Sequence, residues 1–146
     1  MRISGNRDRD EPVIPAPRLF RALADRTRLR IVNLLARGSL CVCDIQRILE
    51  QPQSSVSRHL ALLKSARLVR DRRDGMRTFY SLTGWDSSLA RGVLAAIRAS
   101  LADGGDYLRD VEALTDLRAR GACHVEPKAW SRAGSRKARS ESRMEA

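Results

Sequence analysis

Cys41 and Cys43 are the residues whose type and spacing most clearly predict chemistry in this sequence. Thiolates are ligands for soft ions, and two of them one residue apart form a two-point grip on a thiophilic ion. A disulfide between cysteines so close in sequence is expected to be strained. The pair therefore predicts a site for a soft metal or metalloid ion. The plain alternative is that both are small hydrophobes packed in a helix.

An ion site of this kind needs reduced thiols, and the rest of the sequence favours them. The chain has three cysteines, an odd number, and residues 1–10 are charged and unlike a secretory signal. No apolar run is long enough to span a bilayer. We therefore expect a cytoplasmic protein with reduced cysteines and no membrane partner.

The charge balance predicts a polyanionic partner. Of 146 residues, 28 are Lys or Arg and 17 are Asp or Glu, which gives a formal net charge of +11. Such an excess on a small chain is typical of proteins that bind DNA or RNA, although a basic surface without a specific partner is the alternative. Aromatic residues make up only 4%, which argues against stacking platforms for single-stranded nucleic acid.

Composition divides the chain into three parts. Residues 1–16 mix charges with prolines and predict a disordered N-terminal arm. Residues 122–146 are small, polar and basic, and predict a disordered tail that adds non-specific attraction for DNA phosphates. Residues 17–121 show helical periodicity and are numerous enough to form one domain with its own core.

The first half of that domain predicts a series of short helices. An apolar stripe begins at Leu19, residues 25–27 form a break with capping side chains, and a second helix ends at Gly38. A third helix is expected over about 43–50, with Asp44 in its first turn, where a carboxylate complements the helix dipole.

Residues 51–53 form a turn, and the fourth helix, over 54–64, buries Val56, Leu60 and Leu63 on one face. The second helix of a helix-turn-helix meets base edges in the major groove. The candidate DNA-contacting side chains on this helix are Ser55, Ser57, Arg58 and His59.

These polar side chains are not equally informative. Arg58 is best able to donate two hydrogen bonds to one guanine. Ser54 stands at the start of the helix, where capping the helix is the alternative to contacting DNA. His59 has the alternative of packing against the protein and binding nothing.

Two segments of alternating polarity follow, 68–73 and 76–82, joined at Asp74-Gly75, a strong hairpin signal. A helix-turn-helix followed by a hairpin is the order of a winged helix, so we predict a mainly α fold with a small β-hairpin. The arginines of the wing are expected to contact DNA phosphates or to enter the minor groove. They are Arg70, Arg72, Arg73 and Arg77.

Beyond the hairpin, residues 85–87 open a further helix, Gly104 and Gly105 break it, and a last amphipathic stretch follows. The apolar faces of these segments are broader than a winged-helix core needs. We interpret them as a dimerisation surface; the alternative is that they cover the core of their own subunit.

Residues 19–82 resemble the ArsR/SmtB family of bacterial metalloregulatory repressors. The matching segments are 23–31, 40–45, 54–63 and the wing over 72–82. The resemblance implies a homodimeric winged-helix repressor, joined through its terminal helices, that leaves its operator when a toxic metal or metalloid binds. Two-fold symmetry then implies an inverted-repeat operator in double-stranded DNA.

Within that family, residues 40–44 look like the site of arsenite and antimonite sensors. This implies As(III) or Sb(III) as the inducing ligand of Cys41 and Cys43, with no permanent cofactor. The segment also resembles that of cadmium and lead sensors, which draw further cysteines from the N-terminal arm, and this arm has none. The family's zinc site on the C-terminal dimer helix needs histidines, and the chain has only His59 and His124.

The third ligand of an arsenic site is left open. As(III) prefers three thiolates, and where similar arsenic repressors carry a third cysteine this chain has Gln46. Cys123 is a possible third ligand, from the same chain or its partner; a small thiol or hydroxide is another, and Cys123 is then an ordinary free thiol. Residues two apart on a helix do not face each other, so both thiolates reach one ion only if the helix start is irregular or unwinds.

Three hypotheses remain open. The first is a metalloid-responsive repressor. The second is a thiol redox switch, which we expect to need a bond to Cys123 or between subunits because a Cys-x-Cys disulfide is strained. The third is a non-specific architectural DNA binder with a steep salt dependence. An enzyme is not expected, because no nucleophile has a histidine and a carboxylate near it in a recognisable pattern, and no phosphate loop is present.

Overall fold

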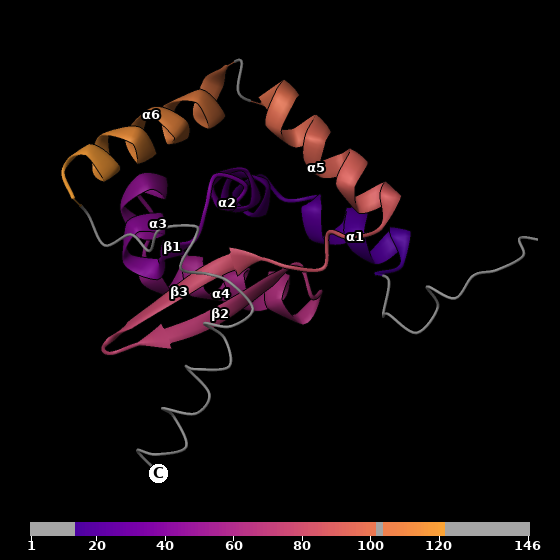
Figure 1. The fold of residues 1–146 in the computed structure, drawn as a ribbon, viewed down its shortest axis with the longest axis horizontal. Coiled ribbons are helices and arrows are strands. Elements are labelled where there is room, and N and C mark those ends of the chain that lie inside the picture. Colours follow the sequence, from indigo (N-terminus) through magenta and orange to yellow (C-terminus); the bar gives the residue numbers. More distant parts are fainter. Residues whose placement is uncertain (1–13, 102–103, 122–146) are drawn as a thin grey trace, which may run out of the picture.

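The computed structural model describes residues 14–101 and 104–121, which form a mainly helical domain with a small antiparallel sheet (Figure 1). In chain order its elements are α1 (Ala16–Leu23), α2 (Arg26–Leu35), β1 (Leu40–Cys41), α3 (Val42–Leu49), α4 (Gln53–Ser65), β2 (Val69–Asp74), β3 (Arg77–Leu82), α5 (Ser88–Ser100) and α6 (Gly105–Ala119). The predicted winged helix-turn-helix is confirmed.

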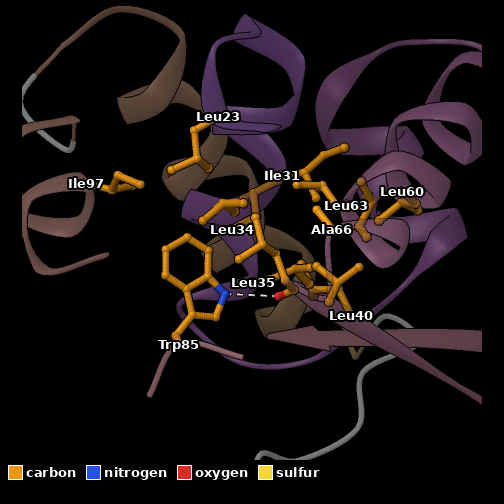
Figure 2. Close-up of a cluster of buried hydrophobic side chains, with 14 of the residues drawn as sticks. Leu23, Ile31, Leu34, Leu35, Leu40, Leu60, Leu63, Ala66, Trp85 and Ile97 are labelled. Atoms are coloured by element: carbon orange, nitrogen blue, oxygen red, sulfur yellow. Dashed lines mark hydrogen bonds between the residues drawn. The ribbon is translucent and has the colours of Figure 1, made fainter. Parts of the chain in front are cut away.

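The core lies between α2 and the helix-turn-helix formed by α3 and α4. Val56, Leu60 and Leu63 are fully buried, as their spacing predicted. All three belong to one core cluster, in which Leu60 and Leu63 lie near Ile31 and Leu34 of α2 (Figure 2). This burial is what holds α4 in place, because an isolated 13-residue helix is only marginally stable in water.

The sheet has three strands in the order β1-β3-β2, so the predicted hairpin is joined by a short strand that the sequence pattern did not reveal. In the hairpin, Asp74 pairs with Arg77, which leaves Gly75 and Met76 as a two-residue loop. Gly75 has φ +61° and Met76 does not have a positive φ. This is the pattern of a type II′ turn, whose first central position favours glycine.

The connection from β3 to α5 is part of the core rather than the start of a helix. Trp85 is buried, and its Nε1 donates to the backbone oxygen of Leu68 at 2.9 Å (Figure 2). Gly84 has φ +72°, and a Cβ there would collide with the backbone oxygen of Arg67. The helix itself begins at Ser88, with the Ser87 side chain accepting from the amide of Ala90.

α5 and α6 form an arch over α2 (Figure 1), with α6 packed on both α2 and α3. Ile97 and Leu114 enter the core, so these helices do cover their own subunit. Arg30 of α2 holds α6 with two hydrogen bonds of 2.8 Å to the Asp110 carboxylate. The side chains of this pair are only 14% and 2% exposed, so the ion pair is largely removed from water.

The first described helix starts slightly earlier than the predicted boundary at residue 17. Ile14 is buried and α1 starts at Ala16, inside the segment 1–16 that was predicted to be an arm. The rest of that arm, the tail over 122–146 and Cys123 lie outside the described residues. No helix in the described ranges is both long and apolar enough to cross a membrane.

Candidate ion-binding site and DNA-binding surface

Cys41 and Cys43 lie on either side of the start of α3. Cys41 is the N-cap residue, extended at φ −76° and ψ 154°, and its Sγ accepts a hydrogen bond from the Asp44 amide at 3.4 Å. Cys43 is the second residue of the helix. Because the chain changes from strand to helix between them, the two side chains point to the same place. The irregular helix start that a shared ion requires is therefore present.

The structure joins Cys41 and Cys43 in a disulfide, with their Cα atoms 5.4 Å apart. That separation lies within the range usual for disulfides. The expected strain of such a bond stays a prediction, whereas an oxidised form does not need Cys123 in this structure, because Cys41 and Cys43 are joined directly. The reason is again the helix start, since the extended Cys41 brings together two side chains that a continuous helix would hold apart.

A carboxylate shares this site. Among the described residues, Cys41, Cys43 and Asp44 are the group whose ligand atoms all lie within 4.8 Å of one another. Asp44 is buried, and Arg47 of the next turn lies 4.0 Å from its Oδ1. The sequence pattern assigns Asp44 only to the helix dipole, whereas the structure also places its carboxylate beside the two sulfurs. Its position next to Cys43, three residues after the N-cap, is the signal that places it in the site.

The cysteine site is connected to the wing through the sheet. Cys41 is fully buried and pairs with Phe79 of β3, and Phe79 pairs on its other side with Arg72 of β2. Cys43 is half-buried and gives the pair its access to solvent. A ligand at the two sulfurs would therefore lie next to β3, which carries Arg77, and would be separated by β3 from Arg72 and Arg73 of β2.

The start of α4 is open. Its N-cap is Pro52, and no side chain caps its first amides. Ser54 is the second helical residue and is not the cap. Ser57 and Arg58 are exposed. Helix amides without a protein partner, beside an exposed arginine, suit a phosphate or a base edge.

Ser55 and His59, two of the predicted contact residues of α4, have partners within the protein. The Ser55 hydroxyl donates to the side-chain oxygen of Gln51 at 3.2 Å, and the Gln51 amide donates to Thr27 at 3.2 Å. This chain of hydrogen bonds ties the turn of the helix-turn-helix to α2.

His59 faces the start of α2. Its Nδ1 lies 3.6 Å from Asp25 Oδ1 and 3.4 Å from a guanidinium nitrogen of Arg28, and its side chain is 15% exposed. Burial raises the pKa of Asp25, but the Arg28 amide, which donates to this carboxylate, and the nearby positive charges outweigh that effect and hold the pKa below its ordinary value. This position suits the packing role for His59 more than direct base contact.

The wing carries its arginines on both strands. Arg73 and Arg77 are exposed, and Arg72 is half-buried. The hydroxyl of Ser81 accepts from Arg70 at 3.3 Å. Lys64 at the end of α4 donates to Asp71 of β2 at 2.9 Å, and this hydrogen bond raises the pKa of Lys64. The ion pair connects α4 to the wing, so the two predicted DNA-contacting elements are held together.

Comparison with known proteins agrees with this arrangement. Residues 25–71 match the family described as bacterial regulatory protein, arsR family. The chain is 40% identical over 89 residues to the arsenic resistance transcriptional regulator ArsR1 of Pseudomonas putida, covering 58% of this chain and 70% of that protein. It is 52% identical over 66 residues to the arsenical resistance operon repressor of Escherichia coli, covering 44% of this chain and 56% of that one.

A solved structure shares the fold. HlyU from Vibrio cholerae is similar with a TM-score of 0.51 and 32% sequence identity, over 56% of this chain and 86% of that chain. The matched family segment contains Cys41, Cys43 and all of α4. With a regulator from Pseudomonas putida matched over more than two thirds of its length, the chain belongs to the arsR family of bacterial regulatory proteins, which bind DNA through a winged helix-turn-helix.

Proposed function

We propose that this protein is a transcriptional repressor that binds operator DNA as a homodimer and is released when As(III) or Sb(III) binds Cys41 and Cys43. The observation that carries the proposal is the convergence of the two sulfurs at the first turn of α3. The disulfide is the oxidised form of the pair. Once reduced, the same two positions offer two thiolates to one soft ion.

The position of these sulfurs supports a response of the DNA-binding surface. The Cys41 sulfur caps α3, so an ion that takes its lone pairs competes with the Asp44 amide for them. Release from DNA then requires the ion to bind the DNA-free conformation more tightly, because a ligand shifts an equilibrium only by its difference in affinity for the two states. The strand pairing of Cys41 and the packing of α3 on α4 are the two routes by which such a change reaches DNA.

The proposal assigns base contacts to Ser57 and Arg58, with phosphate or minor-groove contacts to Arg72, Arg73 and Arg77. A homodimer is supported by apolar side chains that remain exposed on the outer helices: Phe20 is 51% exposed, Leu89 42% and Leu108 40%. Two copies related by a two-fold axis would present two α4 helices to an inverted repeat.

Oxidation of the same pair is the second candidate, because the structure itself joins the two sulfurs. With hydrogen peroxide as oxidant, the two thiols lose two protons and two electrons to form the disulfide, and the peroxide becomes two waters. Both functions use Cys41 and Cys43, so they differ in stimulus rather than in site.

The test is fluorescence anisotropy of the purified protein on the DNA upstream of its own gene, titrated with arsenite, cadmium and zinc under reducing conditions. We expect arsenite to release the wild type, and Cys41→Ser and Cys43→Ser variants to bind DNA but ignore arsenite. A Cys123→Ser variant shows whether that thiol is the third ligand. Release by cadmium alone would favour a cadmium- or lead-responsive repressor. Release by peroxide alone would favour the redox function, and no release by any stimulus would refute both.

A further inference from the structure

A cleft of about 270 Å³ lies between α1, the start of α2 and the last turns of α4. Arg18, Arg21 and Arg28 line one side of it, and Leu62 and Ser65 of α4 line the other. None of the lining residues carries a carboxylate. The cleft is therefore a positively charged site at the C-terminal end of α4, away from the predicted DNA-contacting residues of α4 and of the wing.

Two of the three guanidinium groups are held in place by backbone oxygens. Arg18 donates to the backbone oxygen of Ser65 at 3.2 Å, across from α1 to α4. Arg28 donates to the backbone oxygens of Ala22 at 2.6 Å and of Arg21 at 3.4 Å. A carbonyl oxygen does not neutralise a guanidinium. Of the three charges, that of Arg28 is partly offset by Asp25, whereas Arg18 and Arg21 are exposed at the mouth of the cleft.

The cleft continues the exposed face of the recognition helix. Ser57, Ala61 and Ser65 are spaced four residues apart and are all exposed, so they form one stripe along α4, with Arg58 beside it. Seven residues of helix separate Arg58 from Ser65, which is roughly 10 Å. Duplex DNA carries one negative charge for about every 1.7 Å of its axis, so a duplex lying along this stripe places phosphates near the cleft.

We propose that this cleft binds a phosphate of the operator backbone, with Arg18 and Arg21 as the contacting groups and Arg28 as a supporting charge. The inference rests on the proposed DNA binding and adds α1 to the surface that performs it. Arginine suits this role because its planar fork matches a phosphate in two-point hydrogen bonding. Such a contact positions the protein on DNA without reading sequence.

The test compares Arg21→Ala and Arg18→Ala with Arg98→Ala, which removes an exposed arginine from α5. Binding is measured by anisotropy on the DNA upstream of the gene and on a scrambled duplex of equal length, over a range of salt concentrations. We expect each α1 variant to lose about three- to tenfold in affinity on both duplexes, and to lower the salt slope by about one. Arg98→Ala is expected to change neither quantity by more than a small fraction of this.

Because Arg18 also bonds α4, Arg18→Lys is a second variant that keeps the charge, and it should restore most of the salt slope. In a phosphate ethylation interference experiment, one phosphate in each half-site should weaken wild-type binding when it is ethylated. The same ethylation should have no effect on Arg21→Ala. Equal behaviour of Arg21→Ala and Arg98→Ala would overturn the inference. So would thermal stabilisation by inorganic phosphate that depends on Arg21 without any change in DNA affinity, since the cleft would then be a small-anion site. A wild type that binds both duplexes equally would instead refute the repressor while leaving the salt slopes to decide on the cleft.

Discussion

The two helices of the helix-turn-helix begin in opposite ways. α3 follows a strand, the amide of its third residue, Asp44, donates to the buried sulfur of Cys41, and its start is covered by the sheet. α4 follows Pro52, has no side-chain cap, and leaves its first turn largely exposed. Both starts carry the partial positive charge of a helix dipole. In α3 a protein ligand occupies it, whereas in α4 it is open to an external one.

This difference suggests a division of roles. An open helix start beside exposed polar side chains is suited to DNA, whose phosphates and bases provide the missing acceptors. A closed start whose cap is a sulfur can be altered by whatever binds sulfur. Sensing and DNA binding would then use the same structural feature, the first turn of a helix, in two different states.

The largest expected effect concerns the support of α3 and α2 by α6. Removing the buried carboxylate in Asp110→Ala leaves Arg30 buried without its partner, and we expect the free energy of unfolding to fall by about 3–5 kcal/mol. Asp116→Ala, on the same helix, breaks an Arg120 pair whose side chains are 76% and 66% exposed, and should cost less than about 1 kcal/mol. Urea unfolding followed by circular dichroism measures both, and equal losses would contradict this assignment.

Much of this fold follows from sequence pattern alone. Helical spacing identified Val56, Leu60 and Leu63 as one buried face, and Asp74-Gly75 located the wing, because local periodicity and turn chemistry determine these features. The sequence pattern did not predict β1, because a two-residue strand has no periodicity and forms only by pairing with β3. The sequence pattern places Trp85 at a helix start. Its position in the core depends instead on tertiary packing and on a hydrogen bond to the distant backbone oxygen of Leu68, which no local pattern reveals.

The sequence proposes residues for the candidate site but not their geometry. The spacing of Cys41 and Cys43 indicates the pair, and a helix start near residue 43 was expected, yet only the structure shows that Cys41 is the N-cap and that the two sulfurs meet. The same limit applies to α1. Arg18 and Arg21 look like ordinary surface charges in the sequence, and their relation to α4 depends on tertiary packing across 47 residues of chain.

Giving α4 a closed start should weaken DNA binding. In Pro52→Asp the new carboxylate can cap the free amides and places a negative charge where the duplex is expected, so we predict a loss of about tenfold in DNA affinity. Pro52→Ser offers a cap without a charge and should lose less than about threefold. Anisotropy at one salt concentration distinguishes them. Unchanged affinity in Pro52→Asp would mean that this helix start does not face DNA.

Opening the start of α3 should have a smaller effect, on stability rather than on DNA affinity. Cys41→Ala removes the acceptor for the Asp44 amide and should lower the free energy of unfolding by about 1 kcal/mol under reducing conditions. Cys41→Ser supplies a hydroxyl oxygen in the same position and should retain most of that stability. Both should be equally insensitive to arsenite. A Cys41→Ser variant as unstable as Cys41→Ala would show that the cap does not contribute.

α2 begins in a third way, capped by Asp25, which accepts from the Arg28 amide at 3.0 Å and faces His59 of α4. Because the pKa of this carboxyl is lowered on folding from its ordinary value of 3.8, its contribution to stability is present above that pH and is lost as the pH falls through the folded value. Asp25→Asn keeps a capping oxygen but removes the charge, so it should cost only about 0.3–1 kcal/mol near pH 6. The free energies of unfolding of the two proteins, measured at a series of pH values, should begin to converge as the pH falls below about 3.8 and become equal only below the folded pKa. A difference that persists in acid would show that the amide fits the cap poorly, and that the charge of Asp25 is not what joins the starts of α2 and α4.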